Sequence, residues 1–156
     1  MANIMNAKDS VSASLAECFV TIDGNRYNFM QAISLTATAK KNKTTVPILG
    51  RMSKGNKATS LEYTGKCKFH LNSSIFIKIL EEFKNTGKDL YFDIQVVNED
   101  PTSGAGRQEI WLRDCNVDGL TIASFDADGD YLTDEMDFTF EDWSLGESFK
   151  NLDGML

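Results

Sequence analysis

The sequence predicts a mainly β fold: a β-barrel or sandwich of about seven strands, with one flanking α-helix and a long extended loop. Most segments that contain apolar residues alternate them with polar ones, which is the period of half-buried strands. Only residues 73–86 repeat apolar residues with the spacing of a helix. A chain of 156 residues has the length of one domain, so residues 1–156 are expected to form a single unit.

The strands expected in the first half begin on either side of a short turn. Residues 17–22 and 26–30 flank Gly24, and a short glycine-containing turn between two such segments is typical of a β-hairpin. In residues 31–40 the apolar residues alternate with serine and threonine, as in a half-buried strand. We therefore expect a hairpin followed by a third strand.

A cationic segment follows, in which apolar residues are few. Residues 47–59 contain glycines and cations, among them Gly50 and Arg51, so a long exposed loop or the tip of an extended hairpin is expected. Compact domains rarely keep a long structureless loop unless the loop has a function. This segment is therefore a candidate for an interaction.

The helix expected at residues 73–86 has start and stop signals at its two ends. Asn72, Ser73 and Ser74 provide capping side chains, and Gly87 follows at the position where a helix of this length would end. The apolar residues recur with helical spacing, at Ile75, Phe76, Ile79, Leu80 and Phe83. This apolar stripe is expected to pack on the sheet.

The second half returns to strands. Glycine and proline in residues 98–107 predict a turn. Strands are expected at residues 90–97, 109–113, 120–125 and 136–143.

The charge of the chain is unevenly distributed around a net value of −7. Residues 40–68 contain eight cations and one acid, a balance of +7. Residues 114–156 contain twelve acids and one cation, a balance of −11. Two interpretations stay open: two solvated faces of one domain, or a self-complementary molecule in which the basic segment of one copy meets the acidic surface of another.

An acidic motif that begins at Asp126 matches part of a Ca²⁺-binding loop. Asp126, Asp128 and Asp130 occupy positions one, three and five of an EF-hand window that would end at Asp137. The sixth position requires glycine, but Tyr131 stands there, and the flanking segments have strand patterns rather than helical ones. We therefore interpret these acids as solvated side chains on a strand and a turn.

The sequence contains no set of residues that predicts catalysis or metal binding. Cys67 and His70 are close in sequence, but there is no second pair to complete a tetrahedral zinc site. His70 is the single histidine and lies outside any nucleophile motif. Three widely spaced cysteines predict reduced thiols. We expect no enzyme, no metal site and no cofactor.

The overall composition excludes several classes of protein. An excess of acids, 23 against 16 basic residues, argues against a general duplex-DNA binder. No apolar run approaches the length of a membrane span, and residues 1–13 lack the pattern of a signal peptide, so no membrane anchor is expected.

Several segments together resemble the tail tube proteins of contractile phage tails, in the branch of defective prophages and phage-tail-like bacteriocins. The order and spacing of the segments are more specific than any one of them. They are residues 50–57, 91–95, 103–107, 114–118, 122–128 and 137–142.

The resemblance implies a structural protein whose hexameric rings stack into a hollow tube inside a sheath. It implies an N-terminal extension at residues 1–12 and a basic loop at about residues 40–65 that reaches the adjacent ring. The implied inter-ring contact residues are Lys40, Lys41, Lys43, Arg51, Met52, Lys54 and Lys57. The acids Asp126, Asp128, Asp130, Asp134 and Asp137 are implied on a pore or ring-to-ring surface.

The partners that the resemblance implies are further copies of the chain, the sheath protein, and tape-measure, baseplate and tail-terminator proteins. DNA would pass transiently and without specific contacts if the particle is a phage, and assembly would take place in the cytoplasm of the bacterial host. Two alternatives are the tube protein of a type VI-like secretion device and a monomeric acidic β-domain that binds Ca²⁺ or a small ligand.

Overall fold

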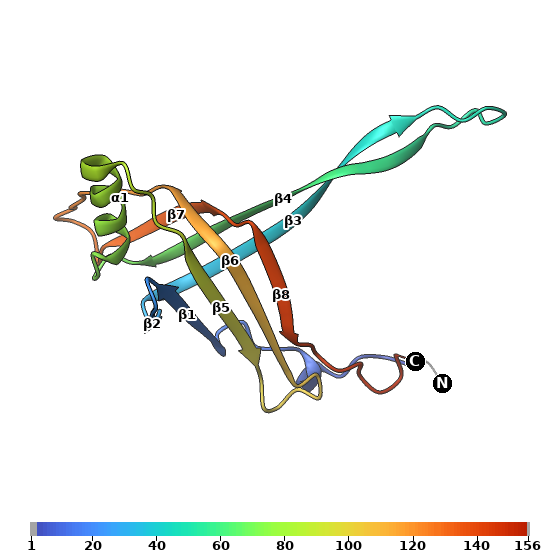
Figure 1. Ribbon diagram of the computed structural model, residues 1–156. Coiled ribbons are helices and arrows are strands. Elements are labelled where there is room, and N and C mark those ends of the chain that lie inside the picture. Colours follow the sequence, from blue (N-terminus) through green and yellow to red (C-terminus); the bar gives the residue numbers. More distant parts are fainter. Residues whose placement is uncertain (1–2, 156) are drawn as a thin grey trace.

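The computed structural model describes residues 3–155, and over this range it contains eight β-strands, one α-helix and one short 3₁₀ helix. The expected class, mainly β with one flanking helix, is confirmed. The strands form a strongly bent sheet that stays open and does not close into a barrel (Figure 1). Residues 1 and 2 of the expected N-terminal extension lie outside the described range.

The elements follow one another with the following bounds. They are η1 (Ala7–Asp9), β1 (Ala16–Ile22), β2 (Asn25–Asn28), β3 (Ala32–Val46), β4 (Gly55–His70), α1 (Ile75–Thr86), β5 (Phe92–Glu99), β6 (Arg107–Gly119), β7 (Thr133–Thr139) and β8 (Asp142–Glu147).

The sheet bends around β6. Its strand order is β2-β1-β5-β6-β7-β4-β3, all neighbours are antiparallel, and β8 pairs with β6 beside this path. The first part of one β6 edge pairs with β8, at residues 109–113, and the last part pairs with β7, at residues 116–119. The chain therefore leaves β7 and continues as β8 along the same edge of β6.

The core fills the space between the two halves of the bent sheet. Ile94, Cys67, Cys115 and Met136 are fully buried there, each with an exposed fraction of 0%. At one end α1 covers the opening and contributes Phe76, which packs against the rings of Phe29, Phe69 and Phe92 with ring centroids 5.5–5.8 Å apart. The expected packing of the helix on the sheet is confirmed.

The sequence predicted the C-terminal end of α1 correctly, but not the capping of its N-terminal end. Gly87 ends the helix in the left-handed conformation, with φ of 73°, and its N–H donates to the carbonyl of Phe83 at 2.9 Å. At the other end Ser74 is the N-cap, but its side chain donates or accepts no capping hydrogen bond. The expectation of a side-chain cap is therefore wrong, and packing of the apolar stripe stabilises this end instead.

Two expected strands differ from the structure. The prediction of a strand at residues 120–125 is wrong: the pairing of β6 with β7 ends at Gly119 and Asp137, and the chain then leaves the sheet, with the backbone N–H of Thr121 donating to the Asp134 carboxylate at 3.0 Å. Residues 120–132 instead form a long loop, which we call the acidic loop. The strand expected at residues 136–143 is divided into β7 and β8, because the chain changes partners between them.

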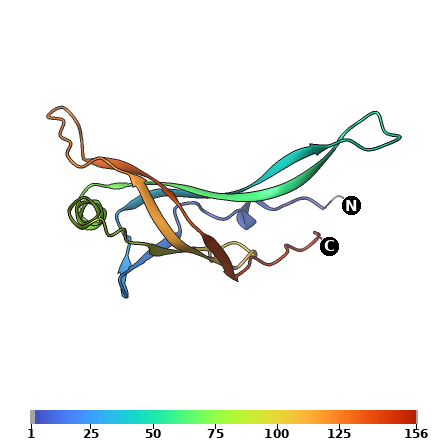
Figure 2. The ribbon, with the colours of Figure 1, turned by 45° about the horizontal axis from the view of Figure 1, so that its top comes forward.

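The cationic segment is an extended hairpin. Strands β3 and β4 pair continuously from Ala32 and Phe69 to Val46 and Gly55, with two irregularities in register. Only residues 47–54, at the end, are unpaired. The outer half of this hairpin, residues 40–62, projects far from the rest of the molecule, and we call it the arm (Figures 1 and 2).

Candidate assembly surfaces

The arm brings all the predicted inter-ring residues onto one projection. Lys40, Lys41 and Lys43 lie on β3, Lys57 lies on β4, and Arg51, Met52 and Lys54 lie at the tip; all seven side chains are exposed. Successive strand residues point to opposite faces, so the arm is cationic on both sides. None of these cations forms an ion pair within residues 3–155. The charge of the arm is thus available to a partner.

The arm tip is apolar as well as cationic. The side chains of Leu49 and Met52 have exposed fractions of 103% and 106%, so the rest of the chain covers neither of them. Met52 was among the predicted contact residues and Leu49 was not. The signal that could have identified Leu49 is its position beside Gly50 in the expected tip, where an apolar side chain has no strand face to cover it.

The structure separates the five predicted acidic residues into three environments. Asp126, Asp128 and Asp130 are exposed in the acidic loop, at the opposite end of the molecule from the arm (Figure 2). Asp137 lies on the outer face of β7, with its carboxylate 3.9 Å from the Lys66 ammonium on β4. Asp134 is buried and belongs to the fold rather than to a surface.

Asp134 connects the acidic loop to β7. Its Oδ2 accepts a hydrogen bond from the backbone N–H of Thr121 at 3.0 Å, and its Oδ1 accepts one from the N–H of Glu135 at 2.8 Å. The carboxylate therefore satisfies two backbone donors at the base of the loop. Within the loop, Asp126 likewise accepts from the N–H of Asp128 at 3.0 Å.

The acidic loop also carries exposed apolar side chains. Ile122, Phe125 and Tyr131 have exposed fractions of 71%, 91% and 69%. The expectation of a strand at residues 120–125 would have placed one of Ile122 and Phe125 in the core, because these two positions fall on opposite faces of a strand. The loop thus resembles the arm tip in combining charge with uncovered apolar groups, but its charge is of the opposite sign.

A charged network holds β8 to β6 on the face that points away from the core. Arg107 forms ion pairs with Glu109 on its own strand and with Glu147 on β8. The indole N–H of Trp111 donates to Glu109, and this bond, together with Arg107, lowers the pKa of that carboxyl below its ordinary value. The guanidinium of Arg113 lies 4.5 Å from the centre of the Trp111 ring. The position of β8 is therefore fixed from the outside.

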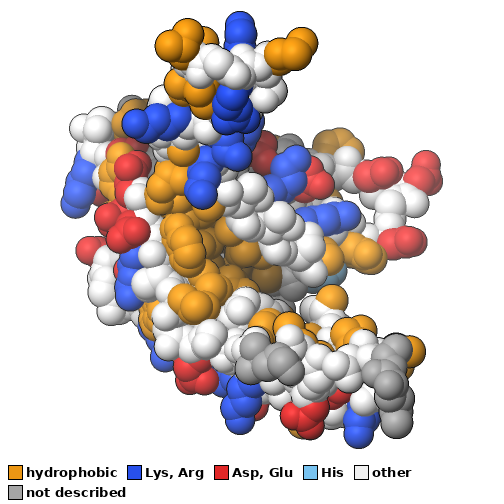
Figure 3. Space-filling model, turned by 90° about the vertical axis from the view of Figure 1, so that its right-hand side faces the viewer, with side chains coloured by type: hydrophobic (Ala, Val, Ile, Leu, Met, Phe, Trp, Pro, Cys, Tyr) orange, Lys and Arg blue, Asp and Glu red, His pale blue; other side chains and the backbone are white. Residues whose placement is uncertain are grey.

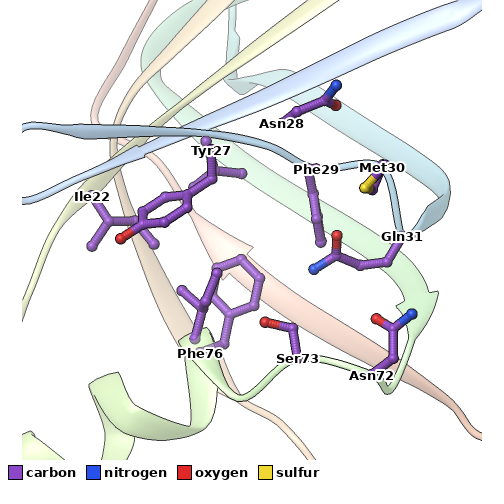
Figure 4. A pocket seen from close by; sticks show the side chains of 11 residues that line it. Ile22, Tyr27, Asn28, Phe29, Met30, Gln31, Asn72, Ser73 and Phe76 are labelled. Carbon is purple, nitrogen blue, oxygen red and sulfur yellow. The ribbon is translucent and has the colours of Figure 1, made fainter.

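A small niche opens between β2 and the start of α1 (Figure 4). Its volume is about 330 Å³, and Phe29 and Phe76 line it together with the side chains of Tyr27, Gln31 and Ser73. The residues that line it include no acid, cysteine or histidine, and its hydroxyl groups are those of Tyr27 and Ser73.

All three cysteines are free thiols with raised pKa values. Burial raises the pKa of Cys18, Cys67 and Cys115 to about 12, so all three are protonated at neutral pH. Over residues 3–155 no three His, Cys, Asp or Glu side chains lie close enough to bind a metal ion together. In the same range no helix has the length and apolar character needed to span a membrane.

The fold and these surfaces define a non-compact β protein with a projecting hairpin and surfaces suited to contact with other chains. The chain belongs to the phage tail tube protein family, which matches residues 3–147.

Two proteins of Bacillus subtilis (strain 168) are similar over nearly the whole chain. They are the phage-like element PBSX protein XkdM and the uncharacterized protein YqbM. Each is 33% identical over 147 residues, which cover 94% of this chain and 97% of the relative.

The fold is similar to a chain in the sheath-tube complex of an extracellular contractile injection system in its extended state. The TM-score is 0.66 at 9% sequence identity, and the match covers 91% of this chain and 94% of the other.

Proposed function

We propose that this chain is a structural, non-catalytic subunit of the inner tube of a phage tail or tail-like particle, in which hexameric rings stack into a hollow tube. The proposal rests on the match of the tail tube family to residues 3–147. The tube would either conduct DNA or be driven through a target envelope when the surrounding sheath contracts.

The exposed area of the chain supports assembly. The chain exposes 11083 Å², whereas a compact monomer of this mass exposes about 7,900 Å². The excess of about 3,200 Å² is comparable to the area that obligate complexes bury, about 2,000–5,000 Å². A subunit with neighbours beside it, above it and below it would cover such an area.

Free strand edges support closure into a ring. The outer edge of β3 and the outer edge of β8 pair with no other strand within residues 3–155. An exposed edge is a template for pairing with another chain, and a closed ring of copies removes it. Ring formation would thus satisfy backbone groups that the isolated chain leaves to water.

The arm is proposed to contact the adjacent ring through Lys40, Lys41, Lys43, Arg51, Met52, Lys54 and Lys57. Its length, its unpaired cations and its uncovered apolar tip are what such a contact requires. The exposed acids Asp126, Asp128, Asp130 and Asp137 are proposed to lie on the pore or on the surface between rings. Carboxylates that face a pore would repel passing phosphates and so prevent DNA from binding to the wall.

The proposed partners are the sheath protein around the tube, the tape-measure protein inside it, and the baseplate and terminator proteins at its ends. A chain of similar fold occurs in a sheath-tube complex, which supports a sheath as one partner. The proposed location is a tail or tail-like particle that is assembled in the cytoplasm of a bacterial host.

Negative-stain electron microscopy of the purified protein at raised concentration tests the proposal. Hollow tubes or rings of uniform width are the expected result. A species that stays strictly monomeric at millimolar concentration in low salt would contradict it. Calorimetric titration with Ca²⁺ should show no tight site; a micromolar affinity would instead favour a Ca²⁺-binding β-domain.

A further inference from the structure

The inner face of the sheet is buried at one end of the molecule and uncovered at the other. Antiparallel pairing places Val20, Ile94, Leu112 and Trp143 in one row across β1, β5, β6 and β8. The first three have exposed fractions of 2%, 0% and 2%, but Trp143 is 42% exposed. The row is therefore buried on β1, β5 and β6 and exposed to solvent on β8.

The next row, two residues further along β8 toward its end at Glu147, is uncovered further. It contains Cys18, Val96, Ile110 and Leu145 on the same four strands. The first three are only half-buried, and Leu145 is 50% exposed. Directly opposed residues of an antiparallel pair lie on the same face, so Trp143 and Leu145 point to the core side of β8 rather than to its outer side.

The opposite wall comes from the base of the arm. Tyr63 on β4 is half-buried and stacks on Phe140, with ring centroids 5.2 Å apart and ring planes at 15°. Leu35 on β3 is half-buried too, and Leu61, two residues from Tyr63 toward the tip, is 55% exposed. An apolar groove therefore runs between this wall and β8, and we call it the open groove.

The open groove is visible as a hollow in which hydrophobic side chains gather, between the arm and the part of the molecule that holds the chain ends (Figure 3). Toward β1 it continues into a cavity of about 640 Å³ lined by Cys18, Ile33, Leu35 and Val96. Contiguous uncovered apolar surface of this kind is rare on monomeric proteins and indicates a binding surface.

We propose that a second copy of the chain covers the open groove and buries Trp143 and Leu145, which makes the groove the contact between neighbouring subunits of one ring. This rests on the proposed function. The area argument supports a second copy as the occupant, because one chain exposes about 3,200 Å² more than a compact monomer. The unpaired edge of β8 borders the groove, so one neighbouring subunit can both pair with this edge and fill the groove.

Tryptophan emission tests this contact directly. The chain has two tryptophans, so the Trp111→Phe variant reports on Trp143 alone. Because Trp111 bonds Glu109 in the network that fixes β8, the variant is used once its circular dichroism and its assembly match those of the unsubstituted protein. The emission of unassembled protein should be that of a partly hydrated indole, and it should shift to shorter wavelength when rings form. An emission maximum that is the same before and after assembly would overturn the inference, as would a short-wavelength maximum in the monomer, which would mean that the chain covers its own groove.

Two charged substitutions on β8 distinguish a specific role of the groove from a general effect of charge on this strand. Leu145→Asp places a carboxylate in the groove, and Ser144→Asp places one on the opposite face of the same strand. The protein concentration at which rings form should rise at least tenfold for Leu145→Asp and stay unchanged for Ser144→Asp. Both variants should keep the circular dichroism of the unsubstituted monomer. Equal assembly of the two variants would contradict the inference.

The outcomes also separate this inference from the proposed function. If the unsubstituted protein forms no rings or tubes, the proposed function fails and the inference fails with it. If rings form and Trp143 stays hydrated, or Leu145→Asp assembles normally, only the groove assignment fails and another surface joins the subunits.

Discussion

Strands β3 and β4 run through both the body of the molecule and the arm, but different forces stabilise these two parts. In the body, β4 buries Cys67 and Phe69 against the core, with exposed fractions of 0% and 3%. In the arm, every residue of the same strand from 56 to 62 is exposed. The arm therefore depends on backbone pairing between β3 and β4, whereas the body depends on apolar packing as well.

The difference teaches how one hairpin can serve two purposes. A two-stranded ribbon is only marginally stable by itself in water, so the arm depends on the continuation of its strands into a packed sheet. Since no core covers the arm, its side chains are free to be cationic. The body supplies stability, and the arm supplies reach and charge.

The largest expected effect is a loss of folding stability at high pH, and it arises in the body, which contains all three thiols. Their folded pKa of about 12 lies above the ordinary value of 9.0. The stability due to the protonated thiols is fully present below pH 9 and is lost as pH rises toward 12. At pH 10 the loss should be about 4 kcal/mol for three thiols.

Urea unfolding at pH 8 and pH 10 measures this loss. A variant with all three cysteines replaced by alanine serves as the control, because it should be less stable at both pH values but lose far less between them. Equal losses in the two proteins would show that the thiols are not buried as described.

The second prediction concerns Gly65, where β4 passes from the body into the arm. A Cβ at this position would lie 2.2 Å from Cζ of Phe138, whose side chain is only 1% exposed and has no room to move. Gly65→Ala should therefore lower the free energy of unfolding by about 3 kcal/mol. Thermal unfolding of the unassembled protein measures the change.

Gly119→Ala is the matched control for Gly65→Ala. Gly119 also lies in a strand, but a Cβ there would have nothing within 4 Å and its φ is not positive. This variant should unfold within about 0.5 kcal/mol of the unsubstituted protein. If both substitutions cost the same, close packing of Phe138 on Gly65 is not what joins the arm to the body.

The smallest effect on stability is expected in the arm. Replacing Arg51, Lys54 and Lys57 together by glutamate should change the free energy of unfolding by less than about 0.5 kcal/mol, because all three are exposed and form no ion pair. The same variant should stack poorly, since its arm no longer carries the charge proposed to meet the adjacent ring. Tube length in electron micrographs measures the second effect.

Tubes of unchanged length from the glutamate variant would contradict the proposed role of these cations. A large loss of stability would contradict the comparison itself, because it would show that arm residues contribute to the packed body. Replacing Ser53 and Thr59 by glutamate provides a control that adds acid to the same projection without removing cations.

The sequence predicted the parts of the fold that local chemistry determines. The helical spacing of Phe76 and Ile79 and the stop at Gly87 identified α1, the turn at Gly24 identified β1, and alternation identified β5, the first part of β3 and most of β7. It also showed that the cations and the acids are segregated along the chain. These features depend on neighbouring residues, so a single sequence contains them.

Only the tertiary structure decided how the strands share their edges and which side chains are left uncovered. The pairing of β6 with β7 ends at Gly119, so residues 120–125 leave the sheet and Phe125 is exposed. Asp134 was expected among the surface acids, but its side chain is buried and its carboxylate accepts two backbone N–H bonds. Pairing and burial join residues far apart in the chain, so the open groove and Trp143 could be recognised only after the sheet was seen to stay open.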